Sequence, residues 1–228
     1  MGMLRVLVRV IADGALTAIV LFASAGTLDW WRAWVLLAVL LVVRGITAVA
    51  VYRVNPELLR ERARLPIHRD QPWTDRLLLL ALVSTGFLAL PALAALDVYR
   101  WHLLPRPQPV LSILGLLLFA LGWGIKGFAL RANAFAAVVV RVQHERHHAV
   151  VDTGVYGIVR HPFYAGTPLV LVGLALWLES SGAALFAVVP TALMVMRLGL
   201  EERFLRRELP GYSEYTVRVP YRLLPNIW

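Results

Sequence analysis

Long apolar runs constrain the fold of this sequence more than any other feature. Four of them, each close to 20 residues, cover Val6–Ala25, Trp34–Tyr52, Leu77–Leu96 and Val110–Leu130. A helix needs about 20 mostly apolar residues to cross the hydrocarbon core of a bilayer. The composition agrees, since 59% of the residues are hydrophobic and only 16% are charged, whereas soluble domains average about 25% charged residues. We therefore predict an all-α integral membrane protein.

Two shorter apolar runs, Gly166–Leu178 and Ala183–Met196, lie on either side of a polar turn. Each is short for a full span, so we expect a helical hairpin that crosses the membrane obliquely or only just. The prediction is about six membrane helices in a single membrane domain, residues 1–228. Its two parts are a four-span part at 1–130, and a loop, the hairpin and a C-terminal helix at 131–228.

The start of the chain resembles a secretory signal peptide, with Arg5 and Arg9 at a basic start and the small residues Ala23-Ser24-Ala25 after the apolar run. A second apolar run follows almost at once, so we expect an uncleaved first helix. In the later runs Pro91 and Pro190 are expected to kink their helices, because proline lacks the N–H that the helical ladder needs.

The net charge of +9 comes almost entirely from arginine, with Lys126 as the only lysine. Six arginines lie in 53–76, four in 131–160 and six from Arg197 onward, whereas the alternate segments carry one and two. The positive-inside rule places both termini, the two basic segments and the tail in the cytoplasm. This pattern indicates membrane topology rather than nucleic-acid binding, and we interpret 53–76 as a solvated loop or short surface helix on anionic lipid headgroups.

Polar residues concentrate between Arg131 and Tyr164, where four of the six histidines lie: His144, His147, His148 and His161. Residues 144–148 satisfy H-E-x-x-H, the pattern of zinc metalloproteases. That chemistry needs one helix to carry both histidines, but the β-branched run Val138–Val142 favours extended chain, and no later segment offers an obvious third ligand. We predict no metal site, and the absence of cysteine also excludes thiolate zinc sites and disulfides.

Two polar segments flank the predicted hairpin. Tyr156–Gly166 precedes its first arm and has Pro162 at a favoured helix-start position, where helix N-terminal amides attract a carboxylate. Arg197 and Glu201, four residues apart on the second arm, share one helix face, while Glu202 points elsewhere. Alone, this pair could be a stabilising ion pair, but the convergence of both segments on one membrane face predicts a binding site. No phosphate loop and no G-x-G-x-x-G motif is present, so a nucleotide-like cofactor would bind at the membrane surface.

The most specific signal is a series of motifs: Gln143-x-Glu145-Arg146, His148-Ala149-Val150-Val151-x-Thr153-Gly154-Val155-Tyr156, Val159-Arg160-His161-Pro162-x-Tyr164-x-Gly166, Arg197-x-x-x-Glu201-Glu202, Leu209-Pro210-Gly211-Tyr212 and Val219-Pro220-Tyr221-Arg222. In order and spacing they resemble the isoprenylcysteine carboxyl methyltransferase family, including its bacterial-type membrane members, which is related to the phospholipid N-methyltransferases. The resemblance covers the C-terminal two-fifths of the chain, and the first four apolar runs match only in hydrophobicity.

The resemblance implies an integral membrane enzyme that uses S-adenosylmethionine. It implies that the 131–160 loop and the hairpin hold this cofactor through Gln143, His148, Ala149, Val150, Val151, Tyr156, His161, Pro162, Phe163, Tyr164 and Glu201. It gives catalytic roles to Arg197 and Glu201, and Arg197 and Asn133 would face the methyl acceptor. Ala136 stands where the family has an aromatic residue, which is a departure on the acceptor side.

The chemistry of S-adenosylmethionine suits these residues. Tyr156 or Tyr164 can stack on adenine or face the sulfonium cation, and Glu201 can pair with the ammonium group or the ribose hydroxyls. A carboxylate acceptor is already a nucleophile, so Arg197 needs only to orient it bidentately, whereas an amine would need a base, for which His148 is the candidate. We expect a lipophilic or lipidated acceptor that enters from the membrane lipids, such as a prenylcysteine carboxylate, and no nucleic-acid partner.

Two other functions stay open on the sequence. Membrane sterol reductases, which use NADPH, carry a similar Arg-His-Pro-x-Tyr-x-Gly segment, but a Glu commonly follows the glycine where this chain has Thr167. A scaffold or small transporter is the non-enzymatic alternative, and a transporter should place ionisable groups near the middle of the membrane. Asp13 and Lys126 lie near predicted span ends, and we expect the deeper Arg44 to pair with Asp13.

Overall fold

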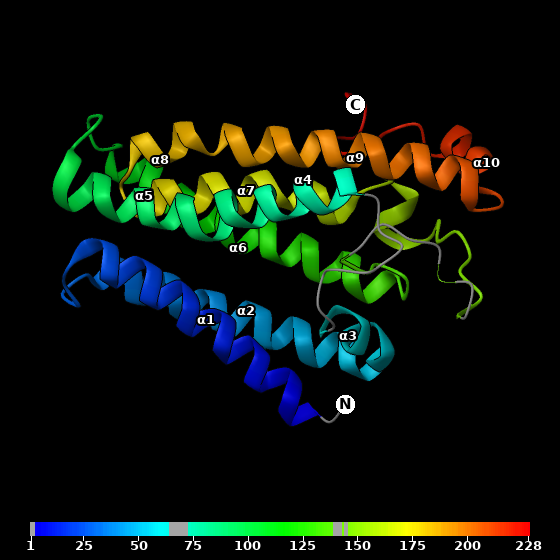
Figure 1. Cartoon of the computed structure of the whole chain (residues 1–228), viewed down its shortest axis with the longest axis horizontal. Coiled ribbons are helices and arrows are strands. Elements are labelled where there is room, and N and C mark those ends of the chain that lie inside the picture. Colours follow the sequence, from blue (N-terminus) through cyan, green and yellow to red (C-terminus); the bar gives the residue numbers. More distant parts are fainter. Residues whose placement is uncertain (1–2, 64–72, 139–142, 144–145) are drawn as a thin grey trace.

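The computed structural model describes residues 3–63, 73–138, 143 and 146–228, and this part of the chain is a helical bundle without strands (Figure 1). Five helical segments are long and apolar enough to cross a membrane: Met3–Ala25, Trp31–Val54, Trp73–Trp101, Pro109–Ala132 and Ser181–Glu208. A shorter apolar helix covers Pro162–Trp177. The predicted all-α membrane fold is confirmed, with four N-terminal spans at the four long apolar runs.

The third span is divided, whereas α1 (Met3–Ala25), α2 (Trp31–Val54) and α6 (Pro109–Ala132) are continuous. It consists of α4 (Trp73–Val83), the π-helical turn η1 (Ser84–Ala89), α5 (Leu90–Leu96) and the π-helical turn η2 (Asp97–Trp101). Pro91 is the second residue after η1. Because proline has no N–H to donate to the preceding turn, the regular α-helical ladder is interrupted at the position where a kink was predicted.

The predicted hairpin is formed by α7 (Pro162–Trp177) and by α8 (Ser181–Phe186) with α9 (Val188–Glu208). α8 and α9 are separated at Ala187, shortly before Pro190. The arms are unequal, which differs from the expectation that both are short: α7 has 16 residues, whereas Ser181–Glu208 has 28. The return arm is longer because its helix continues beyond the apolar run into a charged end.

The loops lie at the two ends of the bundle, with the arginine-poor loops at one end and the arginine-rich segments at the other (Figure 1). At one end Arg32 pairs with Glu179 at 2.9 Å, and the buried Asp97 accepts hydrogen bonds from the Ser180 hydroxyl and the Gly182 N–H. At the other end lie α3 (Pro56–Ala63), the 3₁₀ turn η4 (Gly154–Gly157) and α10 (Tyr212–Arg218). The arginine-rich segments therefore share one end of the bundle, called here the arginine-rich end.

Large apolar side chains cover the outer faces of the long helices. Exposed examples from α1, α2 and α6 are Leu4, Ile11, Ile19, Val42, Ile46, Val110, Ile113 and Leu117. Soluble proteins rarely expose contiguous apolar surface on this scale, which is the surface that lipid covers in a spanning bundle. Within the bundle Arg44 of α2 forms an ion pair with Asp13 of α1, as the sequence predicted.

Four glycines bring α6 and α7 into backbone contact. Gly115 and Gly122 of α6 face Gly166 and Gly173 of α7. A Cβ added at Gly122 would lie 2.7 Å from the Gly166 carbonyl oxygen and 2.9 Å from the backbone N of Val170. Small residues at such spacings allow membrane helices to approach closely and gain dispersion energy. This contact fixes α7, and with it the start of the functional site, against the fourth span.

Gly122→Ala should therefore lower stability by about 1–3 kcal/mol, because the new methyl group meets backbone atoms that cannot give way. Gly124→Ala, two residues along the same helix, is the matched control. A Cβ there meets nothing within 4 Å, so the same exchange should be neutral or stabilise by about 0.5–1 kcal/mol. Thermal unfolding in detergent measures both. Equal effects at the two positions would contradict the close contact of α6 and α7.

Candidate cofactor and acceptor site

A cavity of about 450 Å³ opens within the arginine-rich end of the bundle. One part of its wall is apolar and comes from the spans, with Val10, Ala48, Leu82, Val83 and Leu171 among its residues. The other part is polar and comes from the loop before α7 and from α7, α9 and α10, with His148, Tyr156, His161, Tyr164, Glu201 and Tyr212. One space thus joins a surface suited to a hydrocarbon chain to a surface suited to a polar ligand.

Tyr164 connects the two residues that the sequence singled out on the return arm. Its hydroxyl donates to Glu201 Oε2 at 2.6 Å and accepts a hydrogen bond from Arg197 Nη1 at 2.6 Å. Arg197 also donates through Nε to Asp75 at 2.9 Å and through Nη2 to the Val138 carbonyl at 2.7 Å. Arg197 and Glu201 are therefore linked through Tyr164, and three of the five guanidinium N–H donors are already used by the protein.

Asp75 shows that part of the segment 53–76 belongs to the site. It is 3% exposed and forms an ion pair with the buried Arg197. The prediction of a short helix in this segment is confirmed by α3, and the prediction of a solvated segment is wrong for Asp75, while the contact with lipid headgroups stays a prediction. Asp75 lies in the first turn of the third span, where the bundle packs α4 against α9 and buries the carboxylate beside its partner.

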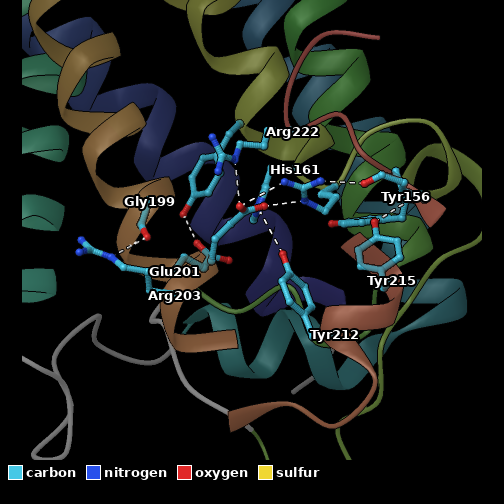
Figure 2. A network of polar contacts seen from close by, with 12 residues as sticks. Tyr156, His161, Gly199, Glu201, Arg203, Tyr212, Tyr215 and Arg222 are labelled. Atoms are coloured by element: carbon cyan, nitrogen blue, oxygen red, sulfur yellow. Dashed lines mark hydrogen bonds and ion pairs between the residues drawn. The ribbon is translucent and has the colours of Figure 1, made fainter. Parts of the chain in front are cut away.

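Glu202 forms a second buried network next to the first. The carboxylate, in a residue that is 3% exposed, accepts hydrogen bonds from Arg160 Nε at 2.6 Å and from Arg222 Nε at 2.9 Å. His161 Nε2 lies 3.1 Å from the same carboxylate and donates to it when that nitrogen carries the proton. The side chains of His161, Tyr212 and Arg222 converge on this point (Figure 2). As predicted, the adjacent carboxylates Glu201 and Glu202 have different partners.

The Glu202 network fastens the C-terminal tail to the start of α7. Arg160 Nη1 donates to the carbonyls of Val219 and Pro220, both at 2.8 Å. The backbone N–H groups of residues 160 and 161 donate to the carbonyls of 221 and 222. The Tyr215 hydroxyl of α10 donates to the Tyr156 carbonyl at 2.7 Å (Figure 2). The tail is therefore a fixed wall of the cavity rather than a free end.

Buried tyrosines give the polar wall neutral hydrogen-bonding groups. Burial raises the pKa of Tyr156 to about 12, because the phenolate would lose its hydration, and the charge of Glu201 adds to the increase. Burial likewise raises the pKa of Tyr212 and Tyr215 well above the usual value. All three hydroxyls thus keep their protons at neutral pH. The Tyr215 hydroxyl donates to the Tyr156 carbonyl, so Tyr156 and Tyr212 are the two that can donate a hydrogen bond to a ligand.

The loop between α6 and α7 is braced by residues that the sequence assigned to ligand binding. Gln143 is fully buried and donates to the Phe135 carbonyl at 2.8 Å, while its own carbonyl accepts from Arg146 at 2.6 Å. The ring of His148 stacks on Phe135 at 4.4 Å. Asn133 Oδ1 accepts the Phe135 N–H at 2.8 Å and closes a turn at the end of α6.

The structure brings most of the predicted site residues to one cavity, whose walls include Asn133, His148, Ala149, Val150, Val151, Tyr156, His161, Phe163, Tyr164, Arg197 and Glu201. Gln143 and Pro162 are not among the lining residues. Gln143 donates a hydrogen bond to the Phe135 carbonyl within the loop, and Pro162 is the first residue of α7. His144 and Glu145, like Val139, Val140 and Val142, lie outside the described residues, so the H-E-x-x-H segment is not placed.

Two cations of the cavity wall were not predicted as site residues. Lys126 of α6 is 7% exposed, so it does not reach out toward a span end as expected. It donates to Thr167 Oγ1 at 2.6 Å and to the Phe163 carbonyl at 3.2 Å. Arg62 of α3 lies over the ring of Phe163 and donates to the Ala136 carbonyl. Burial lowers the pKa of Arg62 to about 10, so it stays charged at neutral pH. Little in the sequence marks these two residues as part of a site, since Lys126 is distinguished only as the single lysine and Arg62 is one of six arginines in its segment.

Comparison with known proteins agrees with this geometry. Residues 110–210 match the phospholipid methyltransferase family. The chain is 34% identical over 113 residues to protein-S-isoprenylcysteine O-methyltransferase B of Arabidopsis thaliana, and 32% identical over 111 residues to protein-S-isoprenylcysteine O-methyltransferase A of the same plant. It is also 28% identical over 98 residues to the cobalt-zinc-cadmium resistance protein CzcN of Cupriavidus metallidurans.

All of these similarities concern part of the chain. Over that part they confirm the resemblance to the phospholipid and isoprenylcysteine methyltransferases that the motifs indicated. The matched region covers 48% and 47% of this chain, and 57% and 56% of the two plant proteins. For CzcN the shares are 42% of this chain and 45% of that protein. The match to the family includes α6, the loop with the polar wall, the hairpin and the Glu201–Glu202 pair, so it coincides with most of the cavity.

Proposed function

We propose that this protein transfers a methyl group from S-adenosylmethionine to a lipophilic acceptor in the membrane. The observation that carries the proposal is the single cavity in which a polar wall of motif residues meets an apolar wall of membrane helices. The match of residues 110–210 to a methyltransferase family and the similarity to plant isoprenylcysteine methyltransferases support the same reaction class. A water-soluble cofactor would enter from the arginine-rich end and the acceptor from the lipid.

The polar wall fits the cofactor. Glu201 uses Oε2 to accept the Tyr164 hydroxyl, and Oε1 has no partner among the described residues, so one carboxylate oxygen is available for an ammonium group or ribose hydroxyls. Tyr156 offers an aromatic face for adenine or for the sulfonium cation. His161 and the backbone near Val150 are proposed to hydrogen-bond the amino-acid end of the cofactor. The remaining proposed contacts are His148, Ala149, Val151, Phe163 and Tyr164.

The reaction needs alignment and water exclusion more than acid–base chemistry. When bound, S-adenosylmethionine would supply an electrophilic methyl group, which would go to an acceptor oxygen while the sulfur keeps the electron pair of the broken C–S bond. We propose a carboxylate acceptor such as a prenylcysteine, which already carries the nucleophilic lone pair. The site then contributes in-line positioning in a dry cavity. If the acceptor is an amine, His148 is the proposed base.

The proposed orientation follows the arginine distribution. Sixteen arginines lie in the segments 53–76 and 131–160 and in the tail from Arg197 onward, and the described parts of these segments share the arginine-rich end of the bundle. The positive-inside rule puts this end in the cytoplasm. Both termini and the polar wall of the cavity would then lie on the cytoplasmic side, where S-adenosylmethionine is available to a membrane enzyme.

Calorimetric titration of the detergent-purified protein with S-adenosylhomocysteine tests the proposal. We expect micromolar affinity, because the polar wall would bind the product much as it binds the cofactor. NADPH and zinc chloride, titrated into the same preparation, serve as controls and should give no heat beyond dilution. Binding of NADPH without binding of S-adenosylhomocysteine would overturn the methyltransferase proposal in favour of a reductase, and no binding of either compound would favour a scaffold or transporter.

A further inference from the structure

Two cations of the cavity wall lie against one aromatic ring. Lys126 Nζ is 3.9 Å from the ring centroid of Phe163, and Arg62 Cζ is 4.9 Å from the same centroid. Lys126 comes from the fourth span and Arg62 from the surface helix α3, so the tertiary fold brings the two charges together. Both residues line the cavity, at the part where Phe163 adjoins Tyr164 of the polar wall.

Neither of these charges is neutralised by a carboxylate among the residues that the structure describes. Their hydrogen-bond acceptors are a hydroxyl and two backbone carbonyls. The two fully buried arginines of the site differ from the half-buried Arg62, since Arg197 pairs with Asp75 and Arg160 with Glu202. Burying a cation without an anionic partner costs several kcal/mol. Such a pair of charges is therefore stabilised when a negatively charged ligand occupies the adjoining cavity.

A third donor and the surrounding apolar wall define the ligand further. Trp123 lies one turn before Lys126 on α6 and lines the same cavity, and its indole N–H is buried without a hydrogen-bond partner in the described part of the chain. Buried donors of this kind usually have partners. The same cavity is also lined by the apolar side chains of Leu79, Val83, Leu130 and Leu171. A ligand that fits both features has an anionic head and a hydrocarbon chain.

We propose that Lys126 and Arg62 form an anion subsite that holds the negatively charged head of the lipid acceptor beside Tyr164. This inference rests on the proposed function and specifies its acceptor as an anionic amphiphile. Arg197, with three N–H donors already committed to Asp75, Tyr164 and Val138, is then a positioning residue that orients Tyr164 and Glu201. The head is a carboxylate or a phosphate, because both present the oxygen atoms that an ammonium and a guanidinium bind.

Binding measurements on matched amphiphile pairs test the subsite. The first pair is N-acetyl-S-farnesylcysteine and its neutral carboxamide, and the second is dioleoyl phosphatidic acid and dioleoylglycerol. The full-length protein in detergent should bind the anionic member of at least one pair about 10- to 100-fold more tightly than its neutral partner, as expected for charge-assisted hydrogen bonds in a buried site. A preference for the anion in the first pair only identifies a carboxylate head, and a preference in the second pair only identifies a phosphate head. A preference in both pairs shows that the site recognises negative charge.

Lys126→Met and Arg62→Met should each remove most of the preference and leave the affinity for the neutral amphiphiles unchanged, whereas Lys126→Arg should keep it. Arg106→Met, which removes a charge at the opposite end of the bundle, is the control and should behave as wild type. Equal binding of both members of both pairs, or a preference that survives Lys126→Met, overturns the subsite.

S-adenosylhomocysteine affinity, measured on the same samples, separates the two proposals. An anion preference in a protein that does not bind S-adenosylhomocysteine keeps the subsite and rejects methyl transfer. Binding of S-adenosylhomocysteine without an anion preference keeps methyl transfer and rejects the subsite. The same titration on Lys126→Met should give wild-type affinity, which also shows that the variant is folded.

Discussion

Replacing Glu202 with alanine should destabilise the protein by about 3–5 kcal/mol, because it leaves a buried charge without its partner. The Glu202 carboxylate binds Arg160, Arg222 and His161 inside the protein. Arg160 is 5% exposed and would keep only the tail carbonyls as acceptors. Since those contacts fasten the tail over the cavity, the affinity for S-adenosylhomocysteine should fall together with the thermal unfolding temperature.

Glu208→Ala is the matched control for this effect. Glu208 lies on the same helix, and its ion pair with Arg207 is largely exposed, so its removal should cost about 0–1 kcal/mol. The double variant Arg160→Met, Glu202→Leu should recover part of the stability, because it removes both buried charges instead of one. A Glu202→Ala protein that melts at the wild-type temperature would show that the network does not hold the tail.

Glu201→Gln should weaken S-adenosylhomocysteine binding by about 10- to 100-fold and leave folding unchanged. The expected loss corresponds to the charge-assisted hydrogen bonds that a carboxylate makes to an ammonium group or to hydroxyls. The amide oxygen of glutamine can still accept the Tyr164 hydroxyl, so the link to Arg197 through Tyr164 should persist. Calorimetric titration measures the affinity, and thermal unfolding in the same detergent measures the stability.

The exposed Glu214→Gln on α10 provides the control, and its affinity should equal that of the wild type. Tyr164→Phe adds a second test, because it keeps the ring and removes the hydroxyl that orients Glu201. We expect an intermediate loss of affinity for this variant. Wild-type binding by Glu201→Gln would mean that Glu201 does not contact the cofactor, even if the protein proves to be a methyltransferase.

The long helices could be predicted because their cause is local. Each of the apolar runs from Val6 to Leu130 is long enough to span a bilayer without reference to any other part of the chain. The pairing of Arg44 with Asp13 followed from the cost of a lone charge at that depth. The length of the return arm was underestimated, since hydropathy ends at Met196 while the helix continues to Glu208.

The site was predicted only where its residues fall in compact motifs. The segment Arg160–Gly166 and the return-arm pair Arg197 and Glu201 stand at recognisable spacings, and the structure brings them to one cavity. Helical periodicity predicted that Glu202 points to a different face from Glu201, but it could not predict which residues Glu202 contacts. Its three partners come from the start of α7 and from the tail, at separations of 20 to 42 residues.

The sequence by itself determined the membrane class, the positions of the spans, the family that its C-terminal part resembles and most of the polar wall, because hydrophobic length and motif spacing are properties of contiguous residues. The tertiary structure decided which charges meet. Asp75 reaches Arg197 across 122 residues of sequence, and Lys126 and Arg62 reach Phe163 from two other elements. Helix packing determines which charged side chains come into contact. That packing depends on glycine contacts such as Gly122 with Gly166, which leave no periodic signal in hydropathy or charge.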